Sequence, residues 1–383
     1  MTDHWLCPDQ LFDGTALRRG MALRVTKGKV TDVQPTMALG DQARPRSIRG
    51  LVTPGFVDLQ VNGGGGVLFN HTPTRAGIAA IAAAHRRFGT VAIMPTVITD
   101  TPTVLAQAAM AAIAAHADTG VAGLHIEGPH IATARRGTHH AGFIRTLDAT
   151  TINLVTDLRR RGIAVMITLA PEAASLGQIT ALATTGAIVS LGHTDATAQA
   201  AQAAFGAGAR AVTHLFNAMS QMQGRAPGVV GAAINSETYA GLICDGIHVA
   251  DEMLGLAMRA RPVPDRMFLV SDAMPTVGGP DHFTLYDAEI RVANGRLINS
   301  QGDLAGAHVT QAQGVARLVQ RIGIPLETAL RMAITVPATL IGAAHLHSLI
   351  GRAASDVMLL DQSLHLVGTL SDHSGTAIDN HRA

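Results

Sequence analysis

The 383-residue sequence is poor in aromatic residues and has almost no excess of charge of either sign. Phe, Trp and Tyr make up 3% of the chain, and a surface that binds single-stranded nucleic acid would need more aromatic rings for bases to stack on. Lys and Arg total 29 against 28 for Asp and Glu, so the basic excess typical of nucleic-acid-binding proteins is missing. We therefore expect no nucleic-acid partner.

Cysteines and long apolar runs are also scarce. The two cysteines, Cys7 and Cys244, stand far apart without paired spacing, which argues against a disulfide framework. No run of about 18 uninterrupted apolar residues occurs, so we expect no membrane span. The first residues lack the basic and apolar stretches of a secretory signal. Together these absences predict a soluble, cytoplasmic protein with reduced cysteines.

The central part of the chain has a regular alternation of short apolar runs and Ala-rich segments with helical periodicity. The expected strands cover residues 53–61, 90–96, 121–127, 163–170, 186–192, 209–215, 240–245 and 267–272. The expected helices cover residues 74–88, 102–117, 148–161, 174–184, 195–205 and 250–260, with 308–322 and 326–341 following the last strand. This alternation predicts an α/β fold, a (β/α)8 TIM-like barrel over residues 51–348.

Both ends of the chain have a different pattern. Residues 1–50 consist of short mixed runs separated by glycine, and residues 349–383 return to the same pattern. We expect the two ends to build one small β-sandwich domain beside the barrel.

Four of the expected barrel strands end in a side chain that binds metals or transfers protons: Glu127, His193, His214 and Asp272. Taken singly, each has a simpler explanation as a structural residue or a solvated loop residue. In a barrel, however, the carboxyl ends of all strands meet at one mouth. One carboxylate and two imidazoles can hold a zinc ion with an open coordination position, and a further carboxylate can act as a base. The pattern therefore predicts a metal-assisted hydrolase.

A series of short segments around these residues resembles a known family. The segments are 54–64 (PGFVDLQVNGG), 124–129 (LHIEGP), 137–139 (GTH), 169–172 (LAPE), 192–197 (GHTDAT), 213–219 (THLFNAM), 224–228 (GRAPG), 245–248 (DGIH) and 270–273 (VSDA). In this order they resemble the N-acetylglucosamine-6-phosphate deacetylases of the amidohydrolase superfamily. The similarity extends over about residues 50–345, with a weaker match at both ends.

The resemblance implies catalytic roles for particular residues. Glu127, His193 and His214 would bind the metal, and Asp272 would act as general base and then as general acid. His139 would polarise the acetyl carbonyl and stabilise the oxyanion. Without the resemblance, His139 would be interpreted as an exposed loop residue, as its neighbour His140 still is.

The resemblance also implies a binding site for a sugar phosphate. Asn217 and Ala218 would present backbone N–H groups to the phosphate, and Arg225 and His248 would complete the anion site. Family members are commonly homodimers, so part of this site is expected to come across the interface. At Ala307, where family members often have serine, the segment 304–308 is expected to border the sugar.

The end of the first strand departs from many amidohydrolases, which hold a second metal there with His-x-His. This chain has Gln60 and Asn62 instead, and amides are poor ligands for transition metals. We therefore expect one divalent metal per subunit, Zn²⁺ first, with Fe²⁺, Mn²⁺ and Co²⁺ as alternatives. Gln60 would either hydrogen-bond the metal's water or cap the barrel core.

The implied reaction is hydrolysis of N-acetyl-D-glucosamine 6-phosphate to D-glucosamine 6-phosphate and acetate. Two alternatives stay open at the level of sequence. One is the same chemistry on N-acetylgalactosamine 6-phosphate, because the motifs do not reveal the stereochemistry at C4. The other is a non-catalytic sensor of sugar phosphates on the same fold.

Overall fold

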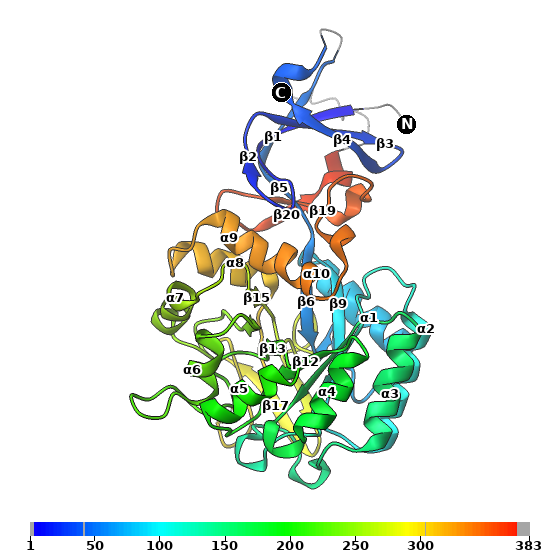
Figure 1. The fold of residues 1–383 in the computed structure, drawn as a ribbon. Helices are drawn as coiled ribbons and strands as arrows, with labels where there is room; N and C mark the ends of the chain where they lie inside the picture. Colours follow the sequence, from blue (N-terminus) through cyan, green and yellow to red (C-terminus); the bar gives the residue numbers. More distant parts are fainter. Residues whose placement is uncertain (1–3, 41–42, 303, 374–383) are drawn as a thin grey trace. The chain divides into compact units, whose positions relative to one another are not determined.

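The structure, a computed structural model, describes residues 4–40, 43–302 and 304–373 (Figure 1). The chain forms two compact units. One combines the two ends of the chain, up to Gly55 and from Ala344 onward, and the other spans Phe56–Ala343. These boundaries lie a few residues from the ones that the sequence suggested.

The terminal unit is built on a single sheet. Its strands are β1 (His4–Phe12), β2 (Leu17–Arg18), β3 (Met21–Thr26), β4 (Lys29–Pro35), β5 (Arg46–Pro54), β19 (Val357–Leu360) and β20 (Leu366–Thr369). Hydrogen bonds join them in the order β20-β19-β5-β1-β3-β4, with β2 paired to β1. The described strands therefore form one continuous seven-stranded sheet. The late strand β19 pairs antiparallel with the early strand β5, which ties the two chain ends together.

The larger unit is a barrel of parallel strands. They are β6 (Phe56–Val61), β9 (Thr90–Ile98), β10 (Leu124–Glu127), β11 (Val165–Leu169), β12 (Ile188–Leu191), β13 (Ala211–Val212), β14 (Tyr239–Leu242) and β15 (Met267–Leu269). Each pairs in parallel with its neighbours along the chain, and a bridge between Val61 and Ala273 joins the first strand to the end of the last. Almost all of their residues are buried, as expected for parallel strands covered on both faces. The predicted (β/α)8 barrel is confirmed.

Helices lie around the outside of these strands (Figure 1). They are α1 (Arg75–Arg86), α2 (Pro102–Ala115), α3 (Ala149–Arg160), α4 (Leu176–Thr184), α5 (Ala198–Gly206), α6 (Gly228–Ile234), α7 (Asp251–Ala260), α8 (Gln311–Gln320), α9 (Leu326–Leu330), the π-helical turn Arg331–Thr335 and α10 (Val336–Leu340). Several begin at a residue whose side chain accepts a backbone N–H of the first turn, among them Thr74, Thr101 and Ser175. Among the described residues, none of the helices is long and apolar enough to cross a membrane.

The sequence analysis missed a small antiparallel sheet between the last barrel strand and α8. It consists of β16 (His282–Leu285), β17 (Ala288–Ala293) and β18 (Arg296–Ile298). Its inner side chains pack on buried residues near the carboxyl ends of the barrel strands, including Leu68, Ile98 and Met274. The insertion therefore lies at the end of the barrel where the strands place their polar residues. A second small addition there is the pair β7 (Gly63–Gly64) and β8 (Val67–Leu68).

Candidate metal centre

Four barrel strands deliver a reactive side chain to one hollow. Glu127 is the last residue of β10, while His193, His214 and Asp272 follow β12, β13 and β15. All four are buried and line a hollow of about 180 Å³. The residues proposed from the strand ends are thus brought together as expected for a barrel mouth.

Three of these residues turn the chain sharply where their strand ends. The φ angles of His193, His214 and Asp272 are 48°, 28° and 50°, in the left-handed region that residues other than glycine rarely adopt. Backbone hydrogen bonds hold the turns, such as that from the Asp272 N–H to the Gln60 carbonyl at 3.0 Å. Strained backbone of this kind clusters at functional sites, where the surrounding structure maintains it.

The distances between Glu127, His193 and His214 suit a metal ion. Glu127 Oε1 lies 3.0 Å from His214 Nε2 and 3.3 Å from His193 Nε2, and the two Nε2 atoms lie 3.2 Å apart. Ligands about 2.0–2.1 Å from a tetrahedral zinc ion lie about 3.3 Å from one another. Burial raises the pKa of Glu127, but its contacts with both imidazoles outweigh burial and hold the pKa well below its ordinary value. A buried anion facing two nitrogens is a set of donors that fits a divalent cation.

The orientation of His193 supports a role as ligand. Its Nδ1 lies 2.9 Å from the carbonyl oxygen of Arg135. A carbonyl only accepts hydrogen bonds, so Nδ1 carries the hydrogen and Nε2 presents a lone pair to the hollow. In contrast, Nδ1 of His214 is buried and has no hydrogen-bond partner among the described residues.

His139 lies in the same hollow and is a further candidate. One ligand atom each of Glu127, His139 and His193 lie within 4.8 Å of one another. Burial lowers the pKa of His139 to about 3, so its imidazole is neutral at pH 7. Distance alone therefore allows His139 either to bind a metal or to donate a hydrogen bond to a substrate.

Asp272 is held by two amides from the end of the first strand. Asn62 Nδ2 donates to Asp272 Oδ1 at 2.7 Å, and Gln60 Nε2 donates to the same oxygen at 3.1 Å. Gln60 also donates to Glu127 Oε1 at 3.0 Å, so its amide links the two carboxylates. Burial, with the nearby charge of Glu127, raises the pKa of Asp272 from 3.8 to about 6. A carboxyl group with a pKa near neutrality is suited to accept and return a proton.

Three of the predicted substrate-binding residues, Asn217, Ala218 and His248, line the hollow as well. Ala218 has a φ of 49°, so the segment after His214 is again strained. His248 Nδ1 lies 2.6 Å from Asp245 Oδ2. Burial raises the pKa of Asp245, but the hydrogen bond with His248 outweighs it and the pKa is lowered. Asp245, which the sequence analysis gave no role, therefore fixes the His248 ring.

Three predicted residues do not line this hollow. Gln60 contacts Glu127 and Asp272 but is not part of the hollow's lining. Arg225 is exposed on the loop after Ser220 and lines a separate hollow of about 480 Å³ with Arg135 and Asp195. Ala307 is buried, and its N–H donates to the Asp272 carbonyl at 3.0 Å. Its segment borders the hollow through Leu304 and Gly306 instead.

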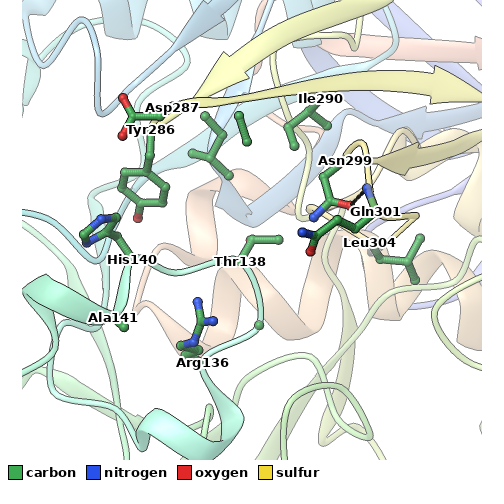
Figure 2. A pocket seen from close by; sticks show the side chains of 13 residues that line it. Arg136, Thr138, His140, Ala141, Tyr286, Asp287, Ile290, Asn299, Gln301 and Leu304 are labelled. Carbon is green, nitrogen blue, oxygen red and sulfur yellow. Dashed lines mark hydrogen bonds between the residues drawn. The ribbon is translucent and has the colours of Figure 1, made fainter.

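A wider hollow of about 730 Å³ adjoins the metal centre (Figure 2). It lies between the loop 136–141 and the inserted sheet, and it shares Gly137, Thr138 and Leu304 with the inner hollow. In Figure 2, Tyr286 lies beside the exposed His140, and the ring centroids are 5.4 Å apart. The Tyr286 hydroxyl donates to the Thr99 carbonyl at 2.6 Å, which fastens the inserted sheet to the end of β9.

The chain is similar to known proteins over most of its length. No protein-family model matches it. It is 37% identical over 350 residues to N-acetylgalactosamine-6-phosphate deacetylase of Shewanella sp. (strain ANA-3), covering 89% of this chain and 87% of that protein. It is 33% identical over 381 residues to N-acetylglucosamine-6-phosphate deacetylase of Rattus norvegicus, covering 94% and 91%. The crystal structure of N-acetylglucosamine-6-phosphate deacetylase from Pasteurella multocida matches with a TM-score of 0.88 at 31% identity, covering 96% of this chain and 98% of that one.

Proposed function

Because the chain belongs to the N-acetylglucosamine-6-phosphate deacetylase family of the amidohydrolase superfamily, we propose that it hydrolyses N-acetyl-D-glucosamine 6-phosphate to D-glucosamine 6-phosphate and acetate. The observation that supports this most strongly is the buried group of Glu127, His193 and His214, with Asp272 in the same hollow. A protein that only bound sugar phosphates would have no need for this costly arrangement of buried charge.

In this proposal Glu127, His193 and His214 hold one divalent ion per chain. Carboxylate and imidazole ligands suit Zn²⁺, with Fe²⁺, Mn²⁺ or Co²⁺ as alternatives. Such an ion supplies Lewis acidity, which lowers the pKa of water and polarises a carbonyl oxygen. Gln60 and Asn62 stand where a second ion's ligands would be expected, but both amides donate to Asp272.

Asp272 is the proposed base and acid. Hydrolysis adds a hydroxyl group to the acetamide carbon, breaks its bond to nitrogen and leaves a proton on the amine. Asp272 would take the proton from the attacking water and return it to the departing nitrogen, and its raised pKa suits both steps. His139 would stabilise the negative charge that develops on the carbonyl oxygen.

The phosphate would lie at the other side of the hollow. Asn217, Ala218 and His248 line the hollow within one chain, but the Asn217 N–H already donates to the His214 carbonyl at 2.9 Å. The Ala218 N–H and the His248 side chain are therefore the donors that we propose for the phosphate. Arg225 is exposed and lines a separate hollow in its own chain, so we propose a homodimer in which the partner subunit's Arg225 completes the anion site. A mass in solution of twice the chain mass would agree with this arrangement, and a strict monomer would exclude it.

A second candidate substrate is N-acetylgalactosamine 6-phosphate. The 37% identical relative carries that name, and its identity to this chain exceeds the 33% of the rat protein. The two sugars differ only in the orientation of the hydroxyl group at C4.

The decisive experiment measures acetate release from both sugar phosphates by zinc-loaded protein, with Asp272→Asn as the inactive control. Faster release from the glucosamine derivative supports the proposal, and faster release from the galactosamine derivative supports the second candidate. Tight binding of either sugar phosphate without acetate release would instead indicate a sensor and overturn the enzymatic assignment.

A further inference from the structure

We propose that Thr99 sets the tautomer of His139, so that this imidazole presents an N–H group, and not a lone pair, to the reacting centre. Thr99 would thereby act as a positioning residue, and His139 would be a hydrogen-bond donor outside the metal's ligand set. The inference deepens the proposed function, on which its catalytic consequence rests.

The contact between the Thr99 hydroxyl group and the His139 ring is short and buried. Thr99 directly follows β9, and its Oγ1 lies 2.6 Å from His139 Nδ1. Both residues are buried. Among the described residues, His139 is the only hydrogen-bond partner of this hydroxyl group. Gly128 packs against the Thr99 hydroxyl group from another side, because a Cβ on this residue would lie 2.2 Å from Thr99 Oγ1.

The direction of this hydrogen bond follows from what each group needs. A hydroxyl group can donate or accept, whereas each nitrogen of a neutral imidazole does only one of these. If His139 Nδ1 donated, the hydroxyl hydrogen of Thr99 would be buried without an acceptor, and that costs free energy. Thr99 therefore donates to Nδ1, and the single ring hydrogen of His139 lies on Nε2.

The neighbouring His193 has the opposite arrangement. Its Nδ1 faces the Arg135 carbonyl, which accepts only, so its Nε2 has the lone pair that a metal requires. The ring centroids of His139 and His193 lie 4.3 Å apart. The two rings nevertheless differ in tautomer, because different groups contact their Nδ1 atoms. This difference separates His193, a ligand, from His139, a donor for the carbonyl oxygen that becomes negative during hydrolysis.

Two substitutions isolate the hydroxyl group. Thr99→Val keeps the shape of the side chain without the hydroxyl, and Thr99→Ser keeps the hydroxyl. In zinc-loaded protein, Thr99→Val should lower kcat roughly 10- to 100-fold with little change in KM, because an oxyanion donor is lost for part of the time. Thr99→Ser should restore most of kcat. Equal losses in both variants, or none in Thr99→Val, would overturn the proposal.

A double-mutant cycle asks whether Thr99 acts through His139. In a protein that already carries His139→Asn, adding Thr99→Val should cause no further loss of kcat. A further loss as large as in the wild-type background would show that the hydroxyl acts elsewhere, and would overturn the proposal.

The tautomer itself can be observed without any turnover. Ring ¹⁵N–¹H correlation spectra of zinc-loaded protein with labelled histidine distinguish the two neutral tautomers, and the His139→Asn spectrum identifies the His139 signals. We expect hydrogen on Nε2 in the wild type and in Thr99→Ser. Hydrogen on Nδ1, or a zinc-coordinated His139, would overturn the inference. This measurement needs only the wild-type protein and the His139→Asn variant, so it stands even if Thr99→Val does not fold or neither sugar phosphate is hydrolysed.

Discussion

The reactive residues of the metal centre are buried, and each influences the pKa values of the others. Glu127 remains ionised because two imidazoles face its carboxylate, whereas burial and the charge of Glu127 move the pKa of Asp272 to about 6. The surroundings of the two carboxylates in this hollow therefore give them different pKa values. Separation of pKa values within a pair is a usual way to divide the roles of ligand and base.

Replacement of Asp272 tests the division directly. Asp272→Asn keeps the hydrogen-bonding shape that Gln60 and Asn62 require, but an amide cannot accept the proton. We expect bound zinc to stay at the wild-type level and kcat to fall roughly 10²- to 10⁴-fold. Metal analysis and acetate release on the same sample check both parts. Activity close to that of the wild type would exclude Asp272 as the base.

The adjacent histidines offer a matched comparison. His139 is buried in the inner hollow, and His140 is exposed in the wider one. We expect His139→Asn to lower kcat roughly 100- to 1,000-fold without loss of zinc, since it removes the proposed oxyanion donor. His140→Asn should leave kcat unchanged. Loss of zinc from His139→Asn would show that His139 is a ligand.

Residues at strand ends were predictable, and residues on long loops were not. Glu127, His193, His214 and Asp272 each follow an apolar run, so the barrel geometry alone brings them together. The position of Arg225 depends on how its loop folds, which no periodicity encodes. Thr99 also follows a strand, and the same strand-end pattern could have pointed to it.

At the scale of elements, the inserted sheet β16–β18 forms part of the wall beside the metal centre. Its strands are short and consist mostly of exposed or partly buried residues, in contrast to the largely buried barrel strands. Helical periodicity and continuous apolar runs therefore revealed the barrel but not this sheet. The turn at Tyr286 has a φ of 52°, which the sequence also gave no sign of.

The hydrogen bond of Tyr286 should anchor this sheet. Tyr286→Phe removes the donor to the Thr99 carbonyl and leaves the ring in place. We expect a loss of about 1 kcal/mol in local stability, because one partly buried hydrogen bond disappears. Hydrogen exchange of residues 282–298 should become faster, while α1 and α3 keep their rates. Unchanged exchange in the sheet would show that packing alone holds it.

At the scale of the whole molecule, the alternation of strands and helices was enough to predict the barrel. It specified the order of strands because parallel neighbours follow one another along the chain. The strand pairing of the terminal unit was harder to predict, since its sheet pairs segments from opposite ends of the sequence. Composition indicated β-structure at both ends but could not specify that all its described strands join in one sheet.

The two cysteines report on the integrity of both units. Cys7 is partly exposed in the terminal unit, whereas Cys244 is buried in the barrel, where burial raises the pKa of its thiol from 9.0 to about 12. A thiol reagent at pH 8 should modify one cysteine in the native protein and two in urea, because the thiolate is the reactive form. Rapid modification of both in the native protein would contradict the described burial.

Activity as a function of bound zinc tests the proposed metal centre most directly. Metal-free protein receives increasing zinc, and acetate release from N-acetyl-D-glucosamine 6-phosphate is measured at each step. We predict a linear rise that stops at one zinc per chain, and no rise in His193→Asn, because Glu127, His193 and His214 are the proposed ligands of a single ion. A rise that continues to two zinc ions per chain, or full activity without added metal, would contradict a single-metal hydrolase.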